Sequence, residues 1–407
     1  MHLAIDSFQR KLFMVLLFAS SISGLIAQYV LSGNKTPIYA AYDAIIITLG
    51  ISSLSYIRAG LRNPIIFIVI CFIINFSYSD VSLYASLNGS REIITIMSLC
   101  IFYNKVFADG NEEEAEWYIQ LVSKFGIFFL LLQIPITFQQ YLAFGPSDAV
   151  GGSFGFGGSG ILTILVICLV YYLHFFAKNI TVNALLYIGL IPLFLNETKI
   201  SFILIPLMIF FVRFQPKIKS ILIAGVGALV FFLIFNNFYE ASYLSFDDSA
   251  SGIFSGDFLS NYLMADIYTF DDIPRFTKII LAWNLIAQDA STFLFGYEYG
   301  LFKGGSMVEI SHFAQTYEWL LIGTRPYLFF LILQGGLLLV VGIFWLVLYV
   351  NKFFRNPNKF QIFLLLIFLM IMCYNDSLRN HNCMTVLFFL MFYANSKYYT
   401  GKLGGSA

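Results

Sequence analysis

Charged residues are scarce in this sequence of 407 residues. Asp, Glu, Lys and Arg make up 11% of it, against about 25% in an ordinary soluble protein, while 59% of the residues are hydrophobic. So little charge cannot cover the surface of a water-soluble fold of this size. The composition therefore excludes a soluble enzyme and a disordered chain, and the formal net charge of zero excludes a nucleic-acid binder with a basic surface.

Signatures of common catalytic and cofactor sites are also missing. The four histidines and five cysteines show no metal-ligand spacing and no Ser-His-Asp order. The glycine-rich stretch 151–158 lacks the Lys-Ser/Thr ending of a nucleotide P-loop, which leaves a flexible turn or a close backbone approach to a ligand. No internal repeat is visible, which argues against a transporter built from two related halves.

What the sequence has instead is a series of apolar runs. About 20 residues cross a bilayer as a helix. The runs lie near 12–31, 38–57, 64–79, 93–108, 117–140, 159–178, 181–195, 199–213, 220–238, 327–350, 360–374 and 382–396. Residues 181–213 are divided because one helix would be about 50 Å long and would carry Glu197 and Lys199 at its centre. The sequence thus predicts an all-α integral membrane protein with about twelve transmembrane helices and a hairpin tip at 196–199.

The positive charges predict the orientation. Fourteen Lys and Arg fall on the side of the N-terminus, and only Lys35, Arg91, Lys199 and Arg379 lie in short loops on the other side. By the positive-inside rule we expect a multi-pass protein with both termini in the cytoplasm. The expected organisation is helices 1–9 in residues 1–238, a long outer loop in 239–326, helices 10–12 in 327–400 and an artificial tail in 401–407.

The long outer loop between spans 9 and 10 is the main candidate for function. Loops above about 15 residues are usually functional or disordered, and this one is rich in aromatic residues. Stretches 275–289 and 310–322 show helical periodicity. We therefore expect a partly helical loop that lies on the membrane surface or caps the bundle.

Seven of the cations predicted to face outwards lie on this loop or at the outer ends of spans. They are Arg91, Lys199, Arg275, Lys278, Lys303, Arg325 and Arg379. Arginine forks bind phosphate oxygens in a bidentate manner, so the set suits a lipid carried on a phosphate or diphosphate. The alternative is that they anchor helices at the interface or pair with loop carboxylates such as Glu298 and Glu309.

Several other ionisable residues are candidates with open alternatives. His312, in the loop, could deprotonate a hydroxyl at neutral pH or be a hydrogen-bonded structural residue. The pairs Asp247-Asp248 and Asp271-Asp272 could hold Mg²⁺ or cap helices. Asp43 lies within a predicted span, where an ionisable group is a functional candidate, or it bonds a neighbouring helix near the outer end.

Three segments resemble the bacterial O-antigen polymerase and O-antigen ligase superfamily. They are Gly151 to Gly160 before a span, Leu195 to Lys199 between two spans, and a series running from Arg275 through Trp283 and the turn 295–300 (FGYEYG) to His312 and Gly323. Lys199 stands where the family usually has Arg, and Phe313 follows His312 where ligases often have Asn. These departures favour a polymerase over a ligase.

The resemblance implies a GT-C-like fold and a metal-independent, inverting glycosyl transfer with no cofactor. A growing glycan on one undecaprenyl diphosphate would move to the terminal sugar of another lipid-linked repeat unit. The implied catalytic residues are Arg275, His312 and Glu309. The implied substrate-binding residues are Lys199, Arg91, Arg325, Lys278, Trp283, Gly296 and Tyr317, with cations on the diphosphate and aromatic rings on sugars.

The implied setting is the inner membrane of a bacterium, where the product would be an O-antigen or a capsule. The implied partners are the undecaprenyl-diphosphate-linked oligosaccharide, the lipid bilayer and a chain-length regulator protein, with no nucleic acid. O-antigen ligase and a lipid-linked glycan transporter or flippase remain alternatives. A transporter should concentrate charge near mid-membrane, whereas the predicted spans place it at the outer face.

Overall fold

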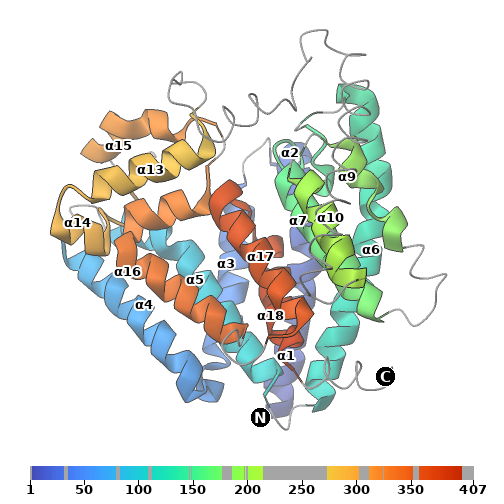
Figure 1. Cartoon of the computed structure of the whole chain (residues 1–407). Helices are drawn as coiled ribbons and strands as arrows, with labels where there is room; N and C mark the ends of the chain where they lie inside the picture. Colours follow the sequence, from blue (N-terminus) through green and yellow to red (C-terminus); the bar gives the residue numbers. More distant parts are fainter. Residues whose placement is uncertain are drawn as a thin grey trace.

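The computed structural model of the protein describes most of the chain as helices (Figure 1). The described residues are 2–31, 35–78, 83–108, 112–145, 147, 149–176, 186–196, 198, 200–213, 273–301, 311–323, 325–351 and 357–396. Within these ranges every regular element is helical and there is no strand. The all-α fold class predicted from the sequence is therefore confirmed for the described part of the chain.

The first half of the chain supplies ten of these elements. They are α1 (His2–Ser21), α2 (Ser23–Tyr29), α3 (Thr36–Ile51), η1 (Leu54–Tyr56), α4 (Ala59–Tyr78), α5 (Leu83–Val106), α6 (Glu112–Phe144), η2 (Gly152–Phe154), α7 (Ser159–Phe176) and α9 (Ile191–Leu195). The remainder are α10 (Ser201–Arg213), α13 (Arg275–Ile286), α14 (Ala290–Phe295), α15 (His312–Tyr317), η4 (Glu318–Leu321), α16 (Tyr327–Val350), α17 (Lys359–Tyr374), η5 (Ser377–Arg379) and α18 (His381–Ala394).

Three described helices, α4, α6 and α16, are long and apolar enough to cross a membrane by themselves. A fourth span arises if α1 and α2, bent by 59°, count as one. Further apolar helices such as α3, α7 and α17 are shorter. The count of twelve spans is thus not reached on these criteria, and the expected run 220–238 lies outside the described residues.

Several expected boundaries do coincide with the structure. Helix α16 occupies 327–350, and α9 ends at Leu195 while α10 begins at Ser201, so the run 181–213 is broken where its charges predicted. In the long loop, α13 begins at Arg275 and α15 spans His312–Tyr317, which confirms helical structure in both amphipathic stretches.

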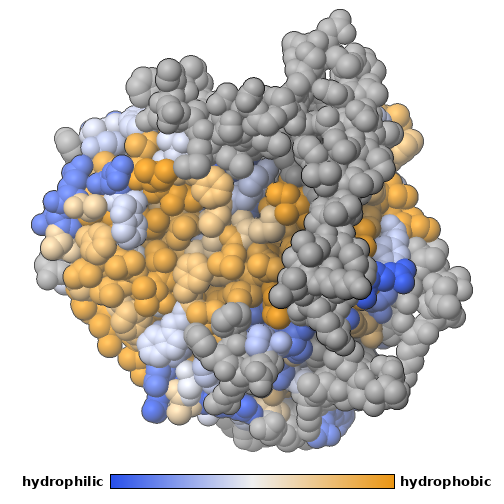
Figure 2. Space-filling view, viewed as in Figure 1, coloured by the Kyte–Doolittle hydropathy of each residue, from blue (hydrophilic) through white to orange (hydrophobic). Residues whose placement is uncertain are grey.

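Exposed apolar side chains identify the protein as membrane-embedded. Large hydrophobic residues point outwards along α4, including Ile66, Ile70 and Ile73, and along α6, including Ile127 and Leu131. Figure 2 shows hydrophobic residues across the middle of one face, with hydrophilic ones gathered above and below. Such a band is stable in contact with lipid tails, whereas its contact with water would be unfavourable.

The loop helices α13 and α14 pack onto α16, and α13 also contacts α17. Arg275, Lys278, Ala282 and Ile286 form the buried face of α13. Helix α13 thus caps one end of the bundle, which is one of the two positions expected from the sequence. This end is where α5, α16 and α18 begin, and we call it the arginine end.

Helix α16 is broken at Gly336, whose φ of 62° is not helical. The turn after α14 enters this break: a Cβ on Gly296 would lie 2.6 Å from the Gln334 carbonyl carbon. The Asn75 amide of α4 donates to the Phe295 and Gln334 carbonyls at 2.6 and 2.9 Å. Three distant segments are therefore locked together beneath the loop helices.

In the glycine-rich stretch 151–158, the backbone closely approaches other parts of the protein. A Cβ on Gly24 of α2 would lie 2.0 Å from the Phe154 carbonyl carbon. Gln133 of α6 donates to the Ser153 hydroxyl at 2.8 Å and accepts from the Ser153 backbone N–H at 2.9 Å. The stretch is therefore a packed corner between α2 and α6.

Candidate functional site

A buried carboxylate joins three helices at the arginine end. Asp43 of α3 lies 2.6 Å from His381 Nε2, at the start of α18, and 3.2 Å from Arg91 Nε of α5. Neither Asp43 Oδ2 nor Arg91 Nε makes a hydrogen bond among the described residues, so that contact is an ion pair without hydrogen-bond geometry. The Tyr39 ring packs on the imidazole, with 5.1 Å between centroids.

A second ion pair lies beside the first. Arg379 of η5 donates through Nε to Glu92 Oε1 at 2.7 Å, and its Nη1 is 3.9 Å from Asp376 Oδ2. Since Glu92 follows Arg91 on α5, the two pairs are adjacent. Both Glu92 and Arg379 are largely buried, with side chains 11% and 23% exposed, so each needs the other to offset the loss of hydration.

Arg325 lies next to this pair and, of the cations at this end, has the fewest polar contacts with described residues. Its guanidinium lies 5.7 Å from the Phe330 ring, and Arg379 lies 4.6 Å from the same ring. Glu92 and Asp376 act on Arg325 electrostatically, but it makes no hydrogen bond or contact ion pair with any described residue. Burial lowers the pKa of Arg325, although an arginine stays charged at neutral pH.

Arg275 reaches the same corner from the loop. Its guanidinium stacks 4.1 Å above the Tyr374 ring at the end of α17, and the side chain is buried. The next residue, Asn375, accepts a hydrogen bond from the Tyr327 backbone N–H at 2.9 Å, which ties the ends of α16 and α17 together. Arg275 thus lies at the end of α17, against a residue that precedes Asp376 by two positions in the sequence.

We call these residues the arginine cluster. Its members are Arg91, Arg275, Arg325, Arg379, Asp43, Glu92, Asp376 and His381. Four guanidinium groups face three carboxylates, which leaves one net positive charge before His381 is counted. A partly buried excess cation with spare N–H donors favours an anionic ligand. Buried His381 Nδ1 has no hydrogen-bond partner among the described residues, so it is a spare donor or acceptor as well.

Other residues predicted to bind substrate serve packing in the structure. The Lys278 ammonium is fully buried and donates to the Ile322 carbonyl. Gly296 ends α14 with a φ of 74° against the α16 break. Trp283 is exposed on α13, edge-on to Phe293 at 5.3 Å. The Tyr317 ring lies 4.5 Å from that of Phe313. A role for these residues towards substrate stays a prediction.

Part of the predicted site lies outside the described residues. This holds for Lys199, Lys303 and Glu309, for the aspartate pairs at 247–248 and 271–272, and for the side chain of His312. The neighbours of Lys199 are placed: Asn196 donates to the Thr163 hydroxyl of α7 at 3.3 Å and accepts from the Thr198 N–H at 3.2 Å.

The start of α7 in turn meets the arginine end. A Cβ on Gly160 would lie 2.9 Å from the Asn375 side-chain nitrogen. The described part of the chain contains no group of three His, Cys, Asp or Glu side chains that could hold a metal ion.

Sequence reasoning missed three members of the cluster, which are Glu92, Asp376 and His381. No local pattern marks Glu92 or Asp376 as a site residue, and His381 is one of four histidines. The signal for His381 was Asp43: a carboxylate inside a predicted span needs a partner, and a histidine at the outer end of another span was available. Asp43 does bond neighbouring helices near that end, which was one of its two expected roles.

Comparisons with known proteins add no relative. No family model matches this sequence, and neither does any curated protein. The resemblance to O-antigen polymerases and ligases is therefore carried by the three segments alone.

Proposed function

We propose that this protein is a membrane glycosyltransferase that polymerises undecaprenyl-diphosphate-linked repeat units into a surface polysaccharide. The observation that carries the proposal is Arg325. It is a partly buried guanidinium beside Arg379, and no described residue forms a hydrogen bond or contact ion pair with it. An arginine held in this way is expected to have an anion as its ligand, and a diphosphate at a membrane surface fits that requirement.

The chemistry needs little beyond charge and one base. The acceptor hydroxyl oxygen attacks the anomeric carbon of the donor glycan, and the bond from that carbon to the diphosphate oxygen breaks. The diphosphate leaves with the bonding electron pair and is stabilised by Arg325 and Arg275. The hydroxyl proton passes to a base, for which His312 and His381 are candidates, with Asp43 orienting the His381 ring. This transfer inverts the anomeric centre and calls for no metal ion.

We further propose twelve spans, a GT-C-like arrangement and a bundle whose arginine end faces away from the cytoplasm. Arg58 and Arg62 lie at the opposite end of the described helices, at the start of α4, as the positive-inside rule requires. Labelling by a membrane-impermeant maleimide in intact spheroplasts tests this orientation. Asp289→Cys should react and Arg62→Cys should not, in a chain whose native cysteines are replaced by serine. The reverse pattern would contradict the proposed topology.

The activity is tested with purified protein and lipid-linked repeat units. We expect Arg325→Ala to reduce polymer formation at least 100-fold, and Arg325→Lys to restore part of it, because lysine keeps the charge but loses the fork. Arg275→Ala should behave like Arg325→Ala, and exposed Arg62→Ala is the matched control. Normal polymer from Arg325→Ala would remove the basis of the proposal.

The same assay separates the alternatives. Transfer of the glycan to a lipid A core, without chain growth, would identify a ligase. Movement of the lipid-linked glycan across a vesicle membrane, with no new glycosidic bond, would identify a transporter.

A further inference from the structure

Helix α13 distributes its side chains in the opposite way to a helix that faces water. Its two charged residues, Arg275 and Lys278, lie on the face that is buried against the bundle, whereas Ile280 and Trp283 are exposed. Partly exposed Phe276 continues this stripe, because the three apolar residues stand at i, i+4 and i+7. A helix between protein and water normally carries its charges on the outer face, so the outer face of α13 is suited to apolar surroundings.

This stripe is continuous with the lipid-facing surface of α4. The Trp283 ring packs edge-on against a ring of α14 at 5.3 Å between centroids, and Leu294 of α14 is exposed. The next residue, Phe295, accepts a hydrogen bond at its carbonyl from the Asn75 amide of α4 at 2.6 Å, and Phe76 beside Asn75 is exposed. An exposed apolar surface therefore runs from α13 over α14 to α4.

The stretch of α4 that faces lipid is shorter than the hydrocarbon core of a bilayer. It begins after exposed Arg62 and reaches Asn75, thirteen residues later, which is about 20 Å of helix. The core is about 30 Å thick, and any tilt of α4 reduces the part that this helix covers. The remaining thickness of about 10 Å equals the diameter of one helix with its side chains. Helix α14, which packs against α4, supplies such a layer together with α13.

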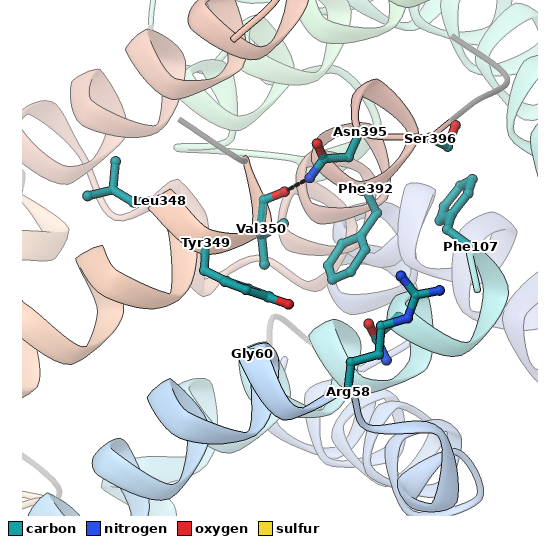
Figure 3. Close-up of a pocket in the computed structure, with 10 residues that line it drawn as sticks. Arg58, Gly60, Phe107, Leu348, Tyr349, Val350, Phe392, Asn395 and Ser396 are labelled. Atoms are coloured by element: carbon teal, nitrogen blue, oxygen red, sulfur yellow. Dashed lines mark hydrogen bonds between the residues drawn. The ribbon is translucent and has the colours of Figure 1, made fainter. Parts of the chain in front are cut away.

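Aromatic side chains mark the other boundary of the core, at the opposite end of the bundle. There a cavity of about 380 Å³ is lined by Arg58, just before α4, and by Tyr349, near the end of α16 (Figure 3). Trp345 and Tyr349 are exposed, and exposed Trp and Tyr side chains are typical of a membrane interface. At the arginine end, the corresponding exposed ring is Trp283. In Figure 2 the hydrophobic residues extend up to the level at which Figure 1 draws α13.

We propose that the outer faces of α13 and α14 bind the lipid bilayer, in the leaflet at the arginine end, at the boundary between headgroups and acyl chains. Interfacial helices bury their apolar face about 5–10 Å deep at this boundary, which matches the thickness that α4 leaves uncovered. The polar turn between the two helices, with exposed Asp289, then lies among the headgroups. The inner face of α13 caps the bundle and its outer face contacts lipid.

This position has a consequence for the arginine cluster. Arg275 is the first residue of α13, so a helix at the interface brings the cluster to the depth of the lipid phosphates. An anion that is carried on a lipid would then reach Arg275 from the bilayer and not from the water above it. This consequence rests on the function proposed above, whereas the contact of α13 with lipid does not.

The test measures how often a nitroxide label collides with oxygen, which concentrates in lipid, and with a nickel chelate that stays in water. The full chain, with its native cysteines replaced by serine, is labelled at Ile280→Cys or Trp283→Cys and placed in phosphatidylcholine vesicles. Ile70→Cys, exposed on α4, is the lipid control, and Glu318→Cys, exposed on η4, is the water control.

We expect the ratio of oxygen to nickel collisions at both α13 positions to exceed that at Glu318→Cys at least about threefold, and to approach that at Ile70→Cys. A ratio equal to that at Glu318→Cys would show that α13 faces water and would overturn the proposal. Few collisions with either reagent would show that protein covers this face, which would overturn the assignment to lipid as well.

The fluorescence of native Trp283 gives a second measurement that leaves the surface of α13 unaltered. In a chain whose Trp117, Trp319 and Trp345 are replaced by phenylalanine, phospholipids brominated near the glycerol end of their acyl chains should quench more than about half of the emission, and aqueous iodide should quench little. Quenching by iodide alone would overturn the proposal. Neither measurement requires polymer formation, so a water-facing α13 would refute this inference and leave the proposed function standing, whereas normal polymer from Arg325→Ala would do the converse.

Discussion

Replacing Glu92 by glutamine should weaken the junction between α5 and the η5 corner. Glu92 Oε1 accepts from Arg379 Nε at 2.7 Å, and both side chains are largely buried. The glutamine keeps the size of the side chain and one acceptor oxygen but removes the charge. Arg379 would then retain only Asp376, whose Oδ2 lies 3.9 Å from Nη1, as its charged partner among the described residues.

The expected magnitude follows from these contacts. Removing one partner of a fully buried ion pair costs about 3–5 kcal/mol. The cost here should be smaller, about 2–3 kcal/mol, because Arg379 is 23% exposed, the glutamine oxygen can still accept, and Asp376 remains. The cluster would also gain one unit of positive charge, which sharpens the repulsion between Arg379 and Arg325.

A double-mutant cycle isolates the contribution of the pair. Glu92→Gln, Arg379→Gln and the double variant are unfolded with denaturant in detergent micelles, and the free energies of unfolding are compared. We expect a coupling energy of about 1–3 kcal/mol. Glu113→Gln, at the exposed start of α6, is the control and should change stability by less than about 0.5 kcal/mol. Additive single effects would refute the reasoning, because the two side chains would then not support each other.

Three further predictions concern the loop helices. Gly296→Ala should lower the free energy of unfolding by more than about 2 kcal/mol in the same assay, because a Cβ would lie 2.6 Å from the α16 backbone. The control Gly157→Ala, with a φ of 72° but nothing within 4 Å of its Cβ, should lower it by only about 1 kcal/mol. Equal losses of stability in the two variants would contradict the close packing at Gly296. Asn75→Ala should lose about 2–4 kcal/mol, since one buried amide serves two carbonyls and an N–H, and a loss below about 1 kcal/mol would show that water replaces it. The hydrogen bond from the Ser291 side chain lowers the pKa of Asp289. The Asp289 carboxylate should therefore cap α14 fully above its ordinary pKa near 4, and the cap should be lost as the pH falls through the lower pKa of the folded state. Hydrogen exchange of the Ser291 and Thr292 amides should then accelerate in wild type but not in Asp289→Asn.

The helices were predictable where lipid or core burial dictates the pattern. The run 327–350 matches α16 in full, and α13 begins at Arg275 directly after Pro274, where a proline favours a helix start. The break inside α16 was not predictable. Gly336 takes its left-handed conformation because the Gly296 turn enters beside it, and a local pattern carries no information about a partner so far away in sequence.

The sequence predicted the positive charge of the site, but it did not predict which side chains form ion pairs there. The sidedness of Lys and Arg placed Arg91, Arg325 and Arg379 at one end of the bundle, and the structure brings them close. Their partners depend on helix rotation and packing, which periodicity does not define: Asp43 and His381 meet across 338 residues of sequence. Lys278 shows the same limit: its ammonium donates to the Ile322 carbonyl, a contact that the loop pattern does not predict, and its role towards substrate stays a prediction.

Helix α5 connects the two ends of the bundle, and the charged side chains are paired to a different extent at each end. Near its end, Lys105 is buried and bonded to Asp6 at 2.6 Å and Gln9 at 2.5 Å, so that lysine is neutralised within the protein. Near its start, Arg91 and Glu92 carry two ion pairs that leave Arg325 without a contact partner among the described residues. A protein that needed these charges only for folding would gain by pairing both ends equally. The unequal treatment is the reason to assign a ligand to the arginine end, and it makes Arg325 the residue whose removal should affect activity more than stability.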